Sequence, residues 1–422
     1  MQTSVTSKSR VYILVLVAAL GYFVDIYDLV LFSVVRIKSF TDIGVSAEDM
    51  RIQGEYVLNM QMAGLLLGGI IWGIIGDKFG RIKVLFGSIF LYSAANIVNA
   101  MVTDIHSYAI IRFIAGIGLA GELGAGVTLV SETMSNEKRG YGTMIVGGVG
   151  LLGAIAAATV AKNFSWQTSY FVGGIMGFVL LFLRIGTFES GMYNKVAQSE
   201  VTKGSFALLF KDRKRLSKYL YCILIGLPLW YIVGILVTQS PEIGKALGAK
   251  ETLSAGTGIM FTYMGIAAGD IFAGLFAQLT KSRRLTMLVF QILSLISVTA
   301  YLSAQEITED QFIWLCLFMG FSVGYWATFV TIASEQFGTN IRALVTTTVP
   351  NFIRGSLIPI TFLFEFFVKG FEIITAGYIM IFLLTAISLF ALSRLKESFN
   401  KDLNYVEEET ENQYIVQNRP EI

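Results

Sequence analysis

Twelve long apolar runs divide this sequence, and they limit its possible folds more than any other feature. An α-helix rises about 1.5 Å per residue, so about 20 consecutive apolar residues cross the hydrocarbon core of a bilayer. Only 15% of the 422 residues are charged, and the mean hydropathy is +0.65. The sequence therefore predicts an all-α membrane protein. Its expected spans are residues 11–35, 54–76, 82–102, 107–131, 141–161, 167–187, 218–238, 254–279, 285–303, 311–333, 343–367 and 372–394.

The positive charges predict how these spans are oriented. Of the 32 lysine and arginine residues, 23 lie in the two tails or in the loops that follow even-numbered spans, and 7 lie in the other loops. Lysine and arginine accumulate in loops that stay in the cytoplasm. We therefore expect a multi-pass protein of the inner (plasma) membrane with both termini in the cytoplasm.

The two halves of the chain repeat one pattern. The segment "SETMSNEKRG" follows the fourth span and "SEQFGTNIRA" follows the tenth, so that Glu132 corresponds to Glu335. Parallel repeats of this kind place a substrate site near the middle of the membrane, between the halves. The expected domains are a six-helix bundle at 1–190, a linker at 191–217, a second six-helix bundle at 218–395 and a tail at 396–422.

Charged residues inside the spans are candidates for function, because a charge at the bilayer centre costs about 3 kcal/mol on insertion scales. Asp25 and Asp28 lie three residues apart, on one face of the first span. From the same side of the membrane, Asp28 lies roughly 12 Å deep and Arg112 roughly 8 Å deep. We expect the two to pair, either as a proton switch or as a static ion cluster that fixes the helix register. Glu122 lies deeper, as a second proton site or a structural group.

The second half contains Asp270 in the eighth span and Arg354 in the eleventh, with Asn351 on the same face as Arg354. Arg354 either holds a substrate carboxylate by a two-pronged contact or neutralises Asp270, and we favour neutralisation.

Aromatic residues accompany these charges. Trp230 and Tyr231 lie beside Pro228 in the seventh span, and Trp326 lies in the tenth. They are candidates for gating or ligand stacking, and the alternative is that they only pack. The expected substrate-binding residues are Tyr27, Gln61, Trp230, Tyr231, Asp270, Trp326, Asn351 and Arg354.

The loop between the second and third spans carries a Gly-x-x-x-Asp-(Arg/Lys)-x-Gly-Arg pattern at Gly73, Asp77, Lys78, Gly80 and Arg81. Together with the span count and the repeat, it resembles the signature of the major facilitator superfamily. "RFIAGIGLAGELGAG" in the fourth span is similar to the second motif of that superfamily. The Asp-x-x-Asp spacing in the first span resembles the metabolite and aromatic-acid:proton symporters, and its Tyr-Asp pair resembles the sugar porters.

The resemblance implies twelve helices in two pseudo-symmetric six-helix bundles, which rock against each other to give alternating access. It also implies import of a small organic solute, such as a carboxylate or an amino-acid-like metabolite, by proton symport. The candidate proton-coupling residues are Asp25, Asp28, Arg112 and Glu122. The candidate conformational latch at the cytoplasmic helix ends consists of Gly73, Asp77, Gly80, Arg81, Glu132, Arg139, Glu335 and Arg342.

Several other functions are less consistent with the sequence. The alternatives to symport are proton antiport, facilitated diffusion and a membrane sensor that binds a metabolite without moving it. Antiporters of the superfamily usually carry a proline in the fifth span, and the fifth span of this sequence has none. The spans contain no histidine, and the two cysteines have no metal-ligand spacing. We therefore expect no enzyme activity, no metal and no cofactor, with protons as the coupling ion. The expected partners are a small-molecule substrate and the lipid bilayer, without nucleic acid, and the expected state is a monomer.

Overall fold

The computed structural model describes residues 8–122, 124, 139–185 and 206–399. In this part of the chain every regular element is a helix. Eleven of the helical spans are long and apolar enough to cross a membrane, and a twelfth apolar helix, Ile105–Leu119, is shorter. The predicted all-α membrane fold with twelve spans is therefore confirmed.

The helices of the first half are α1 (Lys8–Asp42), α2 (Met50–Phe79), α3 (Arg81–Asn99), α4 (Ile105–Leu119), α6 (Arg139–Asn163) and α7 (Trp166–Leu183). The second half contains α9 (Phe206–Lys211), α10 (Arg213–Leu224), α11 (Leu227–Tyr231), the π-helix η1 (Ile232–Val237), α12 (Ser240–Ala246), α13 (Ala255–Thr280), α14 (Arg283–Leu302), α15 (Glu309–Ser322), α16 (Trp326–Glu335), α17 (Thr339–Gly355), α18 (Leu357–Gly370) and α19 (Ile373–Arg394). The seventh span therefore begins at Arg213, inside the expected linker.

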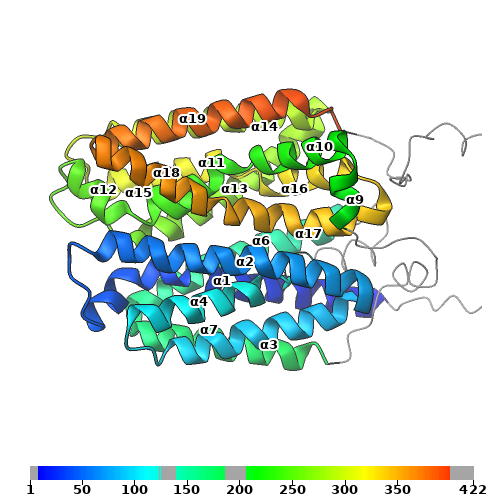
Figure 1. Cartoon of the computed structure of the whole chain (residues 1–422), viewed down its shortest axis with the longest axis horizontal. Coiled ribbons are helices and arrows are strands. Elements are labelled where there is room, and N and C mark those ends of the chain that lie inside the picture. Colours follow the sequence, from blue (N-terminus) through cyan, green and yellow to red (C-terminus); the bar gives the residue numbers. More distant parts are fainter. Residues whose placement is uncertain (1–7, 123, 125–138, 186–205, 400–422) are drawn as a thin grey trace, which may run out of the picture.

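Figure 1 shows the helices α1–α7 gathered on one side of the molecule and α10–α19 on the other. Both ends of the described chain lie at the same end of the molecule. We call the opposite end, which carries the turns after α1, α3 and α6, the distal face. Between the halves, α2 packs on α17 and α6 packs on α13, so four long helices form the interface in which a substrate site is expected.

The turn between α2 and α3 explains one residue of the signature loop. Gly80 ends α2 and precedes α3 with φ 99° and ψ 155°. This left-handed region of backbone conformation is open to glycine and strained for residues with a Cβ. A glycine at this position therefore allows two long helices to be joined by a single residue.

Three spans of the second half are interrupted. In the seventh span, α10 ends at Leu224 and α11 begins at Leu227, with Pro228 in its first turn. The carbonyl of Ile225, at this break, accepts hydrogen bonds from Gln291 Nε2 at 3.3 Å and from Ser388 Oγ at 3.0 Å. A broken helix is stable at membrane depth when neighbouring side chains satisfy its free backbone groups. The tenth span breaks between α15 and α16, and the eleventh between α17 and α18.

Candidate coupling and substrate site

Asp28 and Arg112 are in direct contact inside the first bundle. Arg112 Nη1 donates a hydrogen bond to Asp28 Oδ1 at 2.8 Å, and Nη2 donates to the backbone carbonyl of Asp28 at 3.1 Å. Both side chains are fully buried. The structure thus brings together the two residues whose similar depth suggested an ion pair.

The guanidinium of Arg112 is held on all sides. Its Nε donates to Gln61 Oε1 at 3.2 Å, and Nη1 also donates to Asn96 Oδ1 at 3.1 Å. The ring of Tyr170 lies 5.5 Å from the guanidinium carbon. Asp28, by contrast, has no hydrogen-bond partner for its Oδ2 in the part of the chain that the structure describes. Arg112 is therefore fixed within one bundle, whereas the carboxylate beside it has an oxygen free to accept a proton.

Asp25, one turn earlier on α1, faces the other bundle. Its Oδ2 lies 3.8 Å from Nη2 of Arg354 on α17, and both side chains are at most 1% exposed. Neither oxygen of Asp25 has a hydrogen-bond partner among the described residues. The expected neutralisation of Asp270 by Arg354 is therefore wrong, because the acid beside Arg354 comes from the first bundle. Asp25 and Arg354 form a loose ion pair across the interface.

Arg354 has few other partners. Its Nη1 lies 3.5 Å from Asn351 Oδ1, at the outer limit for a hydrogen bond, and its Nε has none among the described residues. The Trp326 ring lies 5.8 Å from the guanidinium carbon, within cation–π range. Asn351 Nδ2 in turn donates to the carbonyl of Ala120 at 3.0 Å, across the interface. Arg354 is thus a buried cation whose Nε–H group is available, among the described residues, to donate a further hydrogen bond.

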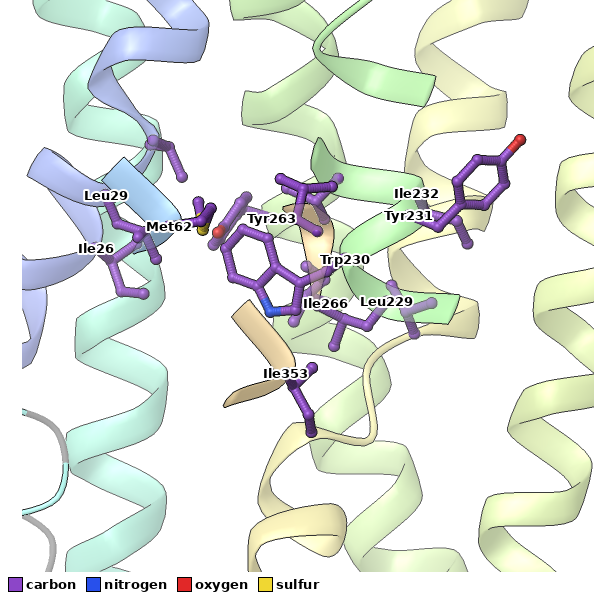
Figure 2. Packing of buried hydrophobic residues seen from close by; sticks show 14 of the residues in the cluster. Ile26, Leu29, Met62, Leu229, Trp230, Tyr231, Ile232, Tyr263, Ile266 and Ile353 are labelled. Atoms are coloured by element: carbon purple, nitrogen blue, oxygen red, sulfur yellow. The ribbon is translucent and has the colours of Figure 1, made fainter. Parts of the chain in front are cut away.

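Trp230 supplies an apolar wall to the same region. Its side chain belongs to the buried cluster that also contains Ile353, the neighbour of Arg354, and its indole Nε1 has no hydrogen-bond partner among the described residues. Figure 2 shows the Trp230 ring pointing toward Leu29 and Met62 of the first bundle. Trp230 therefore lies at the interface, where a ligand could meet both its ring and its N–H group.

Three other residues expected to bind substrate lie away from the interface. Tyr231 points in the opposite direction from Trp230 (Figure 2) and donates to the carbonyl of Gly377 on α19 at 2.9 Å. The hydroxyl of Tyr27 donates to the Ser169 carbonyl on α7 at 2.8 Å. Gln61 bonds Arg112 and the carbonyl of Leu29. Each of the three is adjacent in sequence to a residue of the interface, but the rotation of its helix directs its side chain into the interior of one bundle.

Asp270 is not paired with a cation within 4.0 Å among the described residues. Its Oδ1 instead accepts a hydrogen bond from the backbone N–H of Ala327 at 3.0 Å. The backbone of Trp326 also donates to this carboxylate. Asp270 thus binds the amino end of α16, next to Trp326, and also lies within electrostatic range of Tyr22.

Glu122 pairs with Arg184 inside the first bundle. Arg184 Nη1 donates to Glu122 Oε2 at 3.0 Å, its Nη2 contacts the other carboxylate oxygen, and both side chains are at most 2% exposed. This contact favours the structural alternative for Glu122. In the sequence Arg184 is counted with the cations of the loop after the sixth span although it lies within residues 167–187, and the structure places it at the end of α7 with its side chain turned inward.

Most of the candidate latch lies outside the described residues. Glu132 is not described, and neither are the side chains of Asp77, Arg81, Arg139 and Arg342. Gly73 is buried in α2, where it faces Leu344 of α17. Gly80 forms the turn described above.

Glu335 does have a described partner within the second bundle. It accepts hydrogen bonds from Arg283 Nε at 2.8 Å and Nη2 at 3.1 Å, and from Ser398 Oγ at 2.7 Å. Glu397 caps α14 nearby. Its partial burial raises the pKa of this carboxyl, but the bonds from Ser282 and from the backbone of Arg283 outweigh burial and hold the pKa below its usual value.

A second set of cross-bundle contacts, which we call the distal lock, joins the halves at the distal face. Arg36 on α1 forms an ion pair with Glu242 on α12 at 2.8 Å and donates to the carbonyl of Thr238 at 3.1 Å. Gln239 Nε2 donates to Glu55 Oε1 on α2 at 2.6 Å.

Arg51 completes the distal lock, because it contacts both Glu55 of its own helix and Glu365 on α18. In the sequence, Arg36 and Arg51 count only as loop charges, and the position of Glu365 near the outer end of the eleventh span predicts an interfacial, solvated side chain. The partners of the two arginines lie 206 and 314 residues away, and no local pattern links them.

Two tyrosines complete the polar side of the interface. Tyr22 and Tyr263 are both buried, and each lies within electrostatic range of Asp25 and Arg354. Tyr22 precedes Asp25 by three residues and so shares its helical face. That spacing is a signal in the sequence that could have identified Tyr22.

Known proteins resemble this chain over most of its length. It is 28% identical over 342 residues to a putative metabolite transport protein of Haemophilus influenzae, covering 77% of this chain and 81% of the relative. It is 24% identical over 354 residues to the putative niacin/nicotinamide transporter NiaP of Bacillus subtilis, covering 80% and 84%. The structure of the proton:xylose symporter XylE with 6-bromo-6-deoxy-D-glucose matches with a TM-score of 0.72 at 16% identity, over 94% of this chain and 98% of that one.

These likenesses agree with a family model. Residues 18–358 match the model of the major facilitator superfamily. This range contains both members of the Asp25–Arg354 pair as well as the signature loop. The chain therefore belongs to the major facilitator superfamily.

Proposed function

We propose that this protein imports a small organic carboxylate together with a proton, by alternating access of one central site. Family membership makes it a multi-pass membrane transporter of small metabolites rather than an enzyme. The observation that carries the finer proposal is the loose, buried pair of Asp25 and Arg354 between the two halves.

Arg354 is the proposed anchor for the substrate carboxylate. A guanidinium binds a carboxylate best through two parallel N–H···O bonds, but Asp25 lies 3.8 Å away and Nε has no partner among the described residues. A substrate carboxylate that bonds Arg354 directly would gain contacts that Asp25 does not make. Asp25 and the substrate therefore compete for one cation.

This competition provides the coupling. While Asp25 is ionised, its charge compensates Arg354, and a second carboxylate would add an uncompensated negative charge to a buried site, which is costly. When Asp25 takes up a proton, Arg354 is left for the substrate. A proton and a monocarboxylate thus enter together with no net charge. Asp28, held by Arg112 and with one oxygen unbonded, is the second proposed proton site.

The apolar part of the substrate is proposed to lie against Trp230. Ile26 and Met62 from the first bundle and Ile266 from the second belong to the same buried cluster as Trp230. An aromatic monocarboxylate has one face for such a wall and one charged group for Arg354. Niacin, named for the relative from Bacillus subtilis, has this chemistry.

The two bundles are proposed to rock about this site. The distal lock holds them together at the distal face, and opening it would give access from that side. We propose that the distal face is periplasmic, that both termini are cytoplasmic, that the protein acts as a monomer in the inner membrane, and that protons are its only coupling ion.

The proposal is tested with purified protein in proteoliposomes and radiolabelled nicotinate. With an acidic exterior, we expect nicotinate to accumulate above equilibrium, and a membrane potential alone should not drive it. Asp25→Asn should abolish accumulation but keep nicotinate exchange, because it mimics the protonated acid. Asp28→Asn should also abolish accumulation with some exchange retained.

Arg354→Gln should raise the KM for nicotinate at least tenfold, and nicotinamide, which lacks the carboxylate, is the matched probe of that contact. Glu372→Gln, at an exposed helix end, is the control that should change nothing. Uptake that ignores the proton gradient would mean facilitated diffusion, and binding without uptake would mean a sensor.

A further inference from the structure

We propose that Asp270 is a positioning residue for the substrate site: it caps the second half of the broken tenth span and thereby holds the Trp326 ring over Arg354. This inference rests on the proposed function only for the identity of the ligand. An acid within a transporter span suggests a proton or substrate site, but the contacts of the half-buried Asp270 point to a different role.

The break in the tenth span creates the need for a cap. Helix α15 ends at Ser322 and α16 begins at Trp326. The first backbone N–H groups of a helix have no partner within that helix. The residue that normally supplies a cap, Tyr325, makes no side-chain cap bond. Asp270 Oδ1 accepts from Ala327 N at 3.0 Å, and the Trp326 backbone also donates to this carboxylate.

Close packing of two helices brings Asp270 to this position. Gly265 and Gly269 on α13 face Gly320 and Gly324 around the end of α15. A Cβ added at Gly269 would lie 2.9 Å from the Cα of Gly324, and a Cβ at Gly324 would lie 2.5 Å from the Cα of Gly269. The two backbones therefore touch at the break, as in other small-residue packings of membrane helices. Asp270, the next residue after Gly269, is carried to the first N–H groups of α16.

The same position in the first half has different chemistry. The internal repeat aligns Asp270 with Gly69, 201 residues earlier. The fourth span also ends its regular helix early, at Leu119, but there Asn351 of the other bundle donates to the carbonyl of Ala120. Gly69 has no side chain that could accept a hydrogen bond, so at this position of the repeat the cap belongs to the half that contains Arg354.

The cap acts on the site through Trp326. Trp326 is the first residue of α16, and its ring lies 5.8 Å from the Arg354 guanidinium and 5.5 Å from the ring of Phe329. A carboxylate at a helix amino end favours the first turn through both hydrogen bonds and the helix dipole. Because that turn carries Trp326, a fixed first turn fixes the ring against which Arg354 and an aromatic substrate pack.

The hydrogen-bond role and a charge role make different demands on the side chain. Asparagine keeps a carbonyl oxygen that can accept from the same N–H groups, but it can neither ionise nor exchange a proton. Alanine can neither accept these hydrogen bonds nor ionise. In proteoliposomes we expect Asp270→Asn to keep the nicotinate KM within about twofold, and Asp270→Ala to raise it about fivefold to tenfold, which is the usual size of a lost cap. The maximal rate should change less than KM.

A double-mutant cycle tests whether Asp270 acts through Trp326. In a Trp326→Ala background, the further change Asp270→Ala should alter the KM by less than twofold. If the two effects multiply, or if Asp270→Asn is as harmful as Asp270→Ala, the positioning role is refuted.

A substrate-free readout separates this inference from the proposed function. The chain contains five tryptophans, and incorporation of 5-fluorotryptophan gives each a ¹⁹F signal, with that of Trp326 assigned by its loss in Trp326→Phe. Asp270→Ala should shift or broaden the Trp326 signal, and Asp270→Asn should leave it in place. An unchanged signal in Asp270→Ala refutes the cap even if nicotinate proves to be the wrong substrate. A changed signal without nicotinate transport would contradict only the proposed function.

Discussion

The distal lock should set how often the molecule opens at its distal face. Its central contact joins Arg36, 1% exposed, to Glu242, 21% exposed, at 2.8 Å. Glu242→Gln removes the negative charge but leaves Arg36 its bonds to the carbonyls of Thr238 and Met50. Loss of one charged hydrogen bond costs about 1.5–3 kcal/mol. Because this contact exists only when the bundles are closed at the distal face, the cost falls on the closed state alone.

A cost of about 2 kcal/mol changes the ratio of open to closed molecules roughly 30-fold. If about 1% of the molecules are open at first, the variant should have about a quarter of them open. Spin labels at Thr41 and Ala246, exposed on opposite bundles near the lock, report this change as a second, longer distance in pulsed electron paramagnetic resonance. Arg36→Ala should open the face further, since it removes every bond of that side chain.

Glu372→Gln, also at an exposed helix end of the distal face, is the matched control and should keep the distances of the native protein. The reasoning fails if Glu242→Gln and Arg36→Ala both leave the distance distribution unchanged, because the pair would then contribute nothing to closure. It also fails if the control opens the face equally, because any loss of negative charge there would then suffice.

Further predictions concern stability and specificity. Glu122→Gln should lower the free energy of unfolding by about 1.5–3 kcal/mol, because Arg184 loses the charge of a buried hydrogen-bond partner, and Arg184→Gln in addition should restore part of it in a denaturant titration in detergent. The pKa of the Glu397 carboxyl is lower in the folded than in the unfolded protein. Its ionised form therefore stabilises the fold at pH values above the unfolded-state pKa, and this stabilisation is lost as the pH falls through the folded-state pKa. The decrease in Tm caused by Glu397→Gln should accordingly become smaller toward acidic pH. Trp230→Ala should raise the nicotinate KM, whereas Tyr231→Phe should leave it unchanged, and an equal effect of both would contradict the orientation of the two side chains.

The contact between Asp28 and Arg112 could be predicted because the cost of a buried charge, the helical repeat and the rise per residue all constrain it. Those rules give depth and face within one bundle. They do not give the rotation of a helix in the other half, so they could not choose between Asp25 and Asp270 as the partner of Arg354. The Gln239–Glu55 contact, between residues 184 positions apart, has no sequence signal for the same reason. Arg184 was missed because a cation at a helix end turns to solvent or to the interior depending on packing alone.

The two halves repeat one another in sequence, yet their buried arginines are held differently, and this difference gives each a different capacity. Arg112 donates to Asp28, Asn96 and Gln61 within one bundle, so a ligand could reach it only by displacing bonds already of good length. Arg354 faces a carboxylate of the opposite bundle at 3.8 Å, and its Nε has no hydrogen-bond partner within the described ranges. A site that must bind and release its substrate in every cycle requires contacts that are exchanged at low cost. An arginine whose N–H donors are already engaged by a carboxylate and other side chains would have to break those bonds first. We therefore propose that substrate exchange takes place at Arg354, and that Arg112 fixes the helix that carries both aspartates.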